Sequence, residues 1–206
     1  MYTLYTIPGT CSTGIHTLLN QLNVPFNIAL RDQVDNYSAL VPTNQVPALK
    51  TEQTLLTEGS AIALHLLREH GDKTLTENPE FVQWLMFNYA TLHPAYSKLF
   101  ALKGIMDEGQ TKQAGMQALA DNVANLWKIV DGHLADREFM FGNTATLIDY
   151  LITVYVSWGN VFPELAIPVG SNVLALAERI KALPEFQKAY ASEGAQYSVP
   201  DNALAA

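Results

Sequence analysis

The first seventy residues alternate between two hydrophobic periodicities, and their order constrains the fold more than any other feature. Residues 2–7 alternate along the chain and are rich in β-branched and aromatic side chains, which predicts a strand that ends at Pro8-Gly9. Residues 15–22 place apolar side chains at the spacing of an amphipathic helix, and residues 26–30 alternate again. This order predicts two parallel strands joined by a right-handed crossover.

The next segment adds a hairpin and a helix. A polar stretch with a short helix near residues 37–40 leads to a strand after Pro47, a turn at Glu52-Gln53, and a second strand at residues 54–56. Residues 62–67 then place their apolar side chains on one face of a helix. The predicted order is therefore strand–helix–strand followed by strand–strand–helix. This is the order of a thioredoxin-like domain.

A polar boundary follows, and everything beyond it has a helical pattern. Asn78-Pro79 combines an N-cap residue with a proline at the first helical position. Hydrophobic spacing predicts long helices over residues 81–99, kinked at Pro94, and over residues 116–134. The sequence therefore predicts a thioredoxin-like domain of residues 1–72 and an all-α domain of residues 79–206.

The end of the chain continues in the same way. Thr146 and Asp149 have the spacing of a capping box, which starts a very apolar helix that we expect to end at Pro163. We assign both residues a structural role. Two further helices are expected near residues 173–183 and 185–193.

Composition excludes several classes of function. Hydrophobic residues make up 49% and charged residues 16% of the chain, which is typical of a globular protein. The net charge of −8 argues against nucleic-acid and anionic-membrane binding. A single cysteine excludes an internal disulfide framework, and no metal-ligand spacing appears, so no metal is expected. Because residues 147–158 are too short for a spanning helix and no signal peptide is evident, we expect a cytoplasmic protein.

Several short segments, in this order, resemble a known family. They are residues 7–12, 45–49, 56–62, 84–93 and 142–149. Over essentially its whole length the chain resembles the cytosolic glutathione S-transferases, most closely the bacterial beta class. The resemblance implies a homodimer that acts in detoxification, a glutathione site on the thioredoxin-like domain, and an apolar second-substrate pocket facing the helical domain.

The start of the first helix is the candidate catalytic element. A glutathione transferase must turn a thiol with a pKa of ~8.5 into a thiolate, and a helix N-terminus favours an anion. By resemblance Cys11 holds the beta-class position, where a mixed disulfide with glutathione can form. We expect the helix dipole to lower the pKa of Cys11. Ser12 and Thr10 are alternative donors to the thiolate, and a plain N-cap is the alternative role for Ser12.

The resemblance also assigns residues that bind the peptide and line the cleft. The Val46-Pro47 bond is expected to be cis, which turns the Val46 N–H and C=O outward, ready to pair with the backbone of glutathione's cysteine. His93 matches a cleft histidine, with a helix-surface or interdomain role as the alternative. It is followed by Pro94, where the family often has a basic residue.

Glu58, Gly59 and Ser60 are the expected binding site for the γ-glutamyl end. The helix N-terminus there would bind its carboxylate, and Glu58 its ammonium group. Gly59 stands where the family often has serine, which removes one carboxylate donor.

Cations are scarce in this region. Arg31 and Lys50 are the only ones between residues 31 and 60, so few fixed charges remain for the glycyl carboxylate. Asn44 stands where the family often has glycine, and we expect it to adopt the left-handed conformation.

Two function hypotheses follow. The first is an enzyme that conjugates glutathione to small apolar electrophiles, or that performs thiol–disulfide exchange or peroxide reduction through Cys11. The alternative is a non-catalytic binding or protein-interaction module with the transferase fold. Four aromatic residues are candidates for the second-substrate pocket, although core packing is their favoured role: Tyr96, Phe100, Tyr155 and Trp158.

Overall fold

The N-terminal part of the chain contains a mixed four-stranded sheet. The computed structural model describes residues 1–204. The strand order is β2-β1-β3-β4, formed by β1 (Tyr2–Thr6), β2 (Phe26–Leu30), β3 (Ala48–Lys50) and β4 (Leu55–Leu56). β1 and β2 are parallel, whereas β3 runs antiparallel to both β1 and β4. The thioredoxin-like order predicted from the sequence is confirmed.

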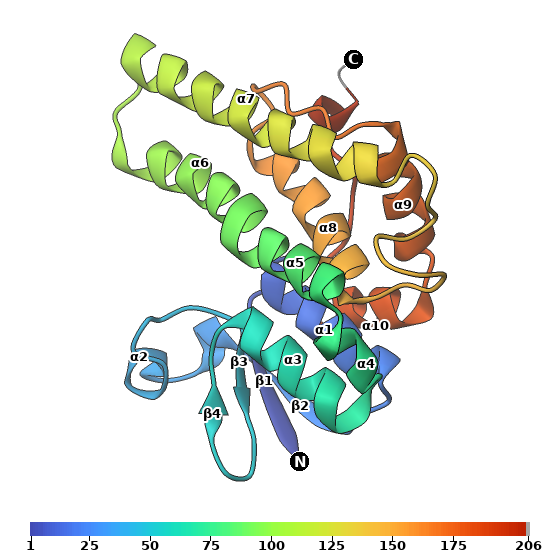
Figure 1. Ribbon diagram of the computed structural model, residues 1–206. Coiled ribbons are helices and arrows are strands. Elements are labelled where there is room, and N and C mark those ends of the chain that lie inside the picture. Colours follow the sequence, from blue (N-terminus) through green and yellow to red (C-terminus); the bar gives the residue numbers. More distant parts are fainter. Residues whose placement is uncertain (205–206) are drawn as a thin grey trace.

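Helices α1 (Cys11–Gln21) and α3 (Gly59–His70) lie between this sheet and the helical part, while the short α2 (Tyr37–Leu40) lies away from them (Figure 1). Residues 11–19 of α1 are all buried. The helix contacts β1 and α3, and also packs against two helices of the C-terminal part, α8 and α10. The start of α1 is therefore held rigidly between the two parts of the molecule.

The rest of the chain is mostly helical. Its helices are α4 (Lys73–Glu77), α5 (Pro79–Phe87), α6 (His93–Ile105), α7 (Gln110–His133), α8 (Leu147–Ser157), α9 (Ser171–Lys181) and α10 (Pro184–Ser192). The Asn78 side chain caps α5, as predicted, by accepting from the N–H groups of Glu80 and Phe81. The predicted polar boundary contains α4, which the sequence did not indicate.

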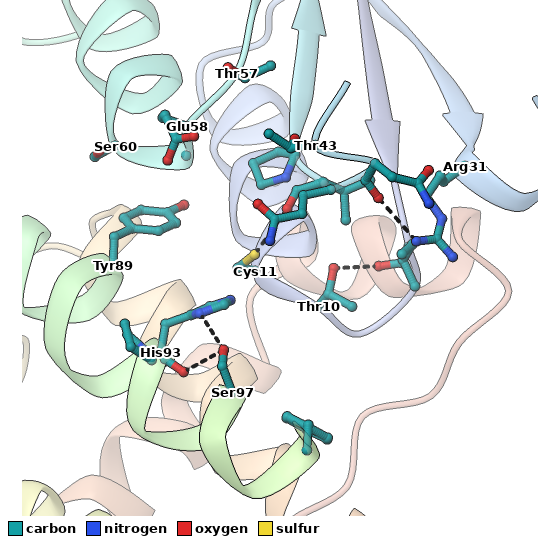
Figure 2. A pocket seen from close by; sticks show the side chains of 18 of the residues that line it. Thr10, Cys11, Arg31, Thr43, Thr57, Glu58, Ser60, Tyr89, His93 and Ser97 are labelled. Atoms are coloured by element: carbon teal, nitrogen blue, oxygen red, sulfur yellow. Dashed lines mark hydrogen bonds between the residues drawn. The ribbon is translucent and has the colours of Figure 1, made fainter. Parts of the chain in front are cut away.

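The long helix of the C-terminal part is interrupted as predicted, but over a whole turn. Between α5 and α6 the hydrogen bonds widen to a π-helical segment, Asn88–Leu92. Pro94 has no N–H to donate, and its ring crowds the carbonyl one turn earlier, so the backbone there must depart from regular α-helix. Tyr89 of this segment and His93, the first residue of α6, lie beside the N-terminal part of the chain (Figure 2).

The core of the helical part is α8, which is buried from Leu147 to Val156. Its capping box is present: Asp149 accepts from the N–H and hydroxyl of Thr146, both at 2.8 Å, and from the N–H of Met140 at 2.7 Å. Burial raises the pKa of Asp149 to about 6, although these hydrogen bonds oppose the rise. The structural role predicted for this pair is confirmed. The helix ends at Ser157 rather than at Pro163, because a 3₁₀ turn, Trp158–Val161, intervenes.

Within residues 1–204, no helix combines the length and apolar character needed to cross a membrane.

Candidate active site

A cavity of about 620 Å³ lies between the sheet domain and the helical part. Its walls come from the start of α1, residues 43–47 before β3, residues 57–60 at the start of α3, and the π segment with α6 (Figure 2). Eight of the nine sequence-predicted site residues line it: Thr10, Cys11, Val46, Pro47, Glu58, Gly59, Ser60 and His93. Ser12 does not.

Thr10 and Cys11 form the start of α1. The Thr10 side chain accepts from the N–H of Ser12, and its hydroxyl donates to the carbonyl of Ile7 at 2.8 Å. Thr10 is therefore the N-cap of this helix. The neighbouring Cys11 thiol faces the cavity and donates to the carbonyl oxygen of Val46, 3.6 Å from the sulfur.

The expected lowering of the Cys11 pKa is wrong. The N–H groups of Cys11 and Ser12 face the sulfur and favour the thiolate, as a helix N-terminus should. Cys11 is only 5% exposed, however, and loss of water outweighs these two donors. Burial raises the pKa of the Cys11 thiol to about 12, so this side chain is a neutral hydrogen-bond donor near neutral pH.

Ser12 is fully buried behind the wall of the cavity. Its hydroxyl lies 2.7 Å from the hydroxyl oxygens of Thr6 and Thr10, and its oxygen also accepts from the N–H of Ile7. The Ser12 hydroxyl is therefore already hydrogen-bonded within the protein. The expectation that Ser12 donates to a thiolate does not fit this position, which instead ties β1 to α1.

The Val46-Pro47 peptide bond is cis, as predicted. Both residues line the cavity, opposite the start of α1. Within the described part of the chain, the Val46 carbonyl accepts only from the Cys11 thiol, and the Val46 N–H makes no hydrogen bond. An extended peptide laid along this segment would find a backbone donor and acceptor available, as in β-strand addition.

The start of α3 is a second helix N-terminus on the same cavity, and no side chain caps it. The Glu58 backbone is in the positive-φ region, at 65°, and its side chain makes no capping bond. The Glu58 carboxylate is exposed and free to meet a ligand. Among residues 1–204, the N–H groups of residues 59–61 make no hydrogen bond, whereas that of Ile62 donates to the Glu58 carbonyl, so an anion at this end of the cavity would be favoured.

His93 lies on the helical wall. Its Nδ1 is 3.2 Å from the hydroxyl of Ser97, and its ring meets those of Tyr155 and Trp158 edge-on. Burial lowers the pKa of His93, so the imidazole is neutral at pH 7. Trp158 is held in turn by a 2.9 Å hydrogen bond from its indole N–H to the carbonyl of Gly9. This bond links the helical wall to the loop before α1.

Arg31 lines the cavity, although from the sequence it was noted only as one of two cations in this region. It directly follows β2, at the edge where the two parallel strands end, which is where ligands bind in parallel sheets. Its position directly after a parallel strand is the signal in the sequence that indicates a ligand-binding role for Arg31. The Arg31 guanidinium bonds Asp32 and donates to the carbonyl of Asn44 at 3.3 Å. Asn44 adopts the predicted left-handed conformation, with φ of 55°.

The aromatic candidates divide into two groups. Tyr96 and Tyr155 are fully buried core residues. Phe100 and Trp158 line the cavity and give it an apolar end. Tyr89 also lines the cavity, and sequence reasoning missed it because its spacing is that of an ordinary core position. No group of metal-binding side chains occurs in the part of the chain that the structure describes.

Comparisons with known proteins show which sequences the chain is similar to. Residues 4–74 match the family described as glutathione S-transferase, N-terminal domain. Glutathione S-transferase GST-4.5 of Xanthomonas campestris is 29% identical over 167 residues, which cover 76% of this chain and 82% of that protein.

Solved structures agree over nearly the whole chain. A glutathione S-transferase from Xylella fastidiosa superposes with a TM-score of 0.84 at 23% identity, covering 95% of this chain and 100% of that one. A beta-class enzyme of Sphingomonas chungbukensis gives a TM-score of 0.76 at 23% identity, with 93% and 98% covered. At these identities the structures establish the fold.

Proposed function

We propose that this chain is a glutathione S-transferase that binds glutathione in the cavity and conjugates it to small apolar electrophiles, as its N-terminal family match, its similarity to GST-4.5 and its fold indicate. The observation that carries this proposal is the meeting of three features at one cavity. These are the Cys11 thiol at the start of α1, the Val46 backbone with its unpaired N–H, and the uncapped start of α3.

The cysteine of glutathione pairs with the N–H and C=O of Val46, which brings its sulfur beside Cys11. Of the three candidate donors, only the Cys11 thiol faces the cavity with a long, replaceable bond. The hydroxyl groups of Thr10 and Ser12 are hydrogen-bonded within the protein. The neutral Cys11 thiol therefore donates to the glutathione thiolate and stabilises it as the nucleophile.

The charged groups at the two ends of glutathione bind protein groups of opposite charge or partial charge. Glu58 takes the γ-glutamyl ammonium, and the first turn of α3 takes the neighbouring carboxylate. Arg31 is the cation within reach of the glycyl carboxylate, although Asp32 already neutralises part of its charge. In this proposal residues 1–72 form the glutathione-binding domain.

The electrophile binds against the helical domain, residues 79–206. His93, Phe100 and Trp158 give this end of the cavity an aromatic wall. Because the His93 imidazole is neutral, the wall holds no fixed charge from that side chain. Such a wall suits a small apolar substrate.

Thiol–disulfide exchange or peroxide reduction is the second branch of this proposal. It requires Cys11 as the attacking thiolate, and a pKa of about 12 leaves roughly one molecule in 100,000 ionised at pH 7. The burial of Cys11 therefore favours conjugation. The non-catalytic alternative is not favoured, since the cavity brings these three features together and GST-4.5, which matches 76% of this chain, is a transferase by name.

Two further parts of the proposal rest on the family resemblance. They are assembly as a homodimer and a cytoplasmic location. Sedimentation velocity tests the first, and a fluorescent fusion in the source cell tests the second.

Turnover of an aromatic chloride with glutathione tests the activity. We expect wild-type turnover, a fall of about tenfold or more in kcat/KM for Cys11→Ala, and no change for Ser171→Ala, an exposed residue at the start of α9. Calorimetry with glutathione separates the hypotheses. Absence of binding at millimolar ligand would overturn the proposal and leave the non-catalytic module.

A further inference from the structure

Tyr89 reaches from the π-helical segment to the start of α3 (Figure 2). A side chain at position 59 would overlap the ring and hydroxyl of Tyr89. Gly59 and Tyr89 are therefore complementary, because the absence of a side chain at one position makes room for the other. π segments are frequent at functional sites, and this one carries Tyr89 into the wall of the cavity.

The Tyr89 hydroxyl is buried and has no hydrogen-bond partner within residues 1–204. Buried hydroxyl groups in native proteins nearly always find a partner, and an exception calls for a specific cause. Burial raises the pKa of Tyr89 well above its usual value, so the phenol keeps its proton and remains a donor.

The uncapped start of α3 is the second, independent feature at this place. Glu58 makes no side-chain cap, and the first residues of the helix line the same cavity as Tyr89, which lies against position 59. Helix α3 is 12 residues long, so its N-terminus carries a substantial positive partial charge. A neutral phenol that donates a hydrogen bond beside such a terminus favours the binding of a carboxylate.

We propose that the Tyr89 hydroxyl donates to a ligand carboxylate bound at the start of α3, supplying the side-chain donor that Gly59 lacks. The inference rests on the proposed function, in which this carboxylate is that of the γ-glutamyl residue of glutathione. Glu58 does not oppose this role, because its charge is directed to the ammonium group on the same ligand residue. A residue of the helical part thereby helps select a ligand held mainly by the N-terminal domain.

Calorimetric titration of Tyr89→Phe tests the inference with two ligands. One is glutathione, and the other is its analogue with γ-aminobutyrate in place of the γ-glutamyl residue, which lacks only that carboxylate. We expect Tyr89→Phe to weaken glutathione binding about tenfold and to leave the analogue within twofold of wild type. Equal loss for both ligands, or no loss for glutathione, would overturn the role of Tyr89.

Tyr155→Phe is the matched control. The Tyr155 hydroxyl is also buried without a partner among the described residues, but it does not line the cavity. We expect this variant to bind glutathione as wild type does, and a loss equal to that of Tyr89→Phe would contradict the inference. If wild type binds the tripeptide and Tyr89→Phe binds it equally, only the inference fails. If wild type does not bind it, the proposed function and the inference both fail.

Discussion

The Cys11 thiol donates to the Val46 carbonyl oxygen across a sulfur–oxygen distance of 3.6 Å. This contact joins the start of α1 to the segment before β3 at the point where, in our account, the sulfur of glutathione binds. A thiol–carbonyl bond is weak, and a ligand can replace it. Cys11 is therefore available as a donor without loss of a strong internal bond.

The reactivity of Cys11 should follow its burial. With a pKa of about 12, the thiolate fraction rises tenfold per pH unit, so the logarithm of the alkylation rate should rise linearly from pH 6 to 10. Iodoacetamide labelling followed by mass spectrometry measures this rate, with N-acetylcysteine as the control that levels off above its own pKa of ~8.5. A plateau below pH 8 for Cys11 would show that the helix N-terminus outweighs burial.

Ser12→Ala should lower the stability of the fold and leave catalysis nearly unchanged. The substitution removes contacts to Thr6, Thr10 and Ile7 in a fully buried place, and we expect it to lower the free energy of unfolding by about 1–3 kcal/mol. Urea unfolding measures this loss. The kcat/KM for conjugation should stay within threefold. Loss of activity at unchanged stability would instead make Ser12 the thiolate donor.

Gly59→Ala should weaken both folding and ligand binding. Its new methyl group overlaps Tyr89, and overpacking of this kind costs about 1–3 kcal/mol. Thermal unfolding and glutathione titration check the two effects. Gly132→Ala in α7 is the matched control, since nothing lies within 4 Å of the added methyl group, and we expect it to be neutral or stabilising. Wild-type behaviour of Gly59→Ala would contradict the close packing of Tyr89.

The capping box of α8 should contribute to stability alone. Thr146→Ala is expected to cost about 1–2 kcal/mol, as for other N-caps. Asp149→Ala should cost more, about 3 kcal/mol, because it leaves the N–H groups of Met140 and Thr146 buried and unpaired. Chemical unfolding measures both, and neither variant should change the KM for glutathione. A larger loss for Thr146→Ala than for Asp149→Ala would contradict this hydrogen-bond assignment.

Short sequence motifs correctly predicted the structural features that depend on neighbouring residues. Asn78-Pro79, the capping box of Thr146 and Asp149, and the left-handed Asn44 each depend on a few neighbouring residues, and each is confirmed. The family resemblance added the cis bond at Pro47, which no periodicity would reveal.

What the sequence did not reveal depends on side-chain positions that the three-dimensional fold sets. Cys11 has the helix N-terminus that was expected, but its burial, which sets its pKa, depends on how the whole fold encloses it. The hydroxyl of Ser12 turns to Thr6 in the preceding strand rather than to the cavity. Tyr89 meets Gly59 only because a π segment, caused by nearby Pro94, interrupts the helix. None of these relationships follows from spacing along the chain.

In the proposed function, this cavity holds the sulfur of glutathione as a thiolate beside Cys11. Ultraviolet absorbance of the thiolate, recorded against pH for glutathione bound to wild type and to Cys11→Ala, tests it most directly. We predict that the pKa of bound glutathione falls at least one unit below its free value of ~8.5, and that about half or more of this shift is lost in Cys11→Ala. An unshifted pKa for glutathione bound to the wild-type protein would contradict the account.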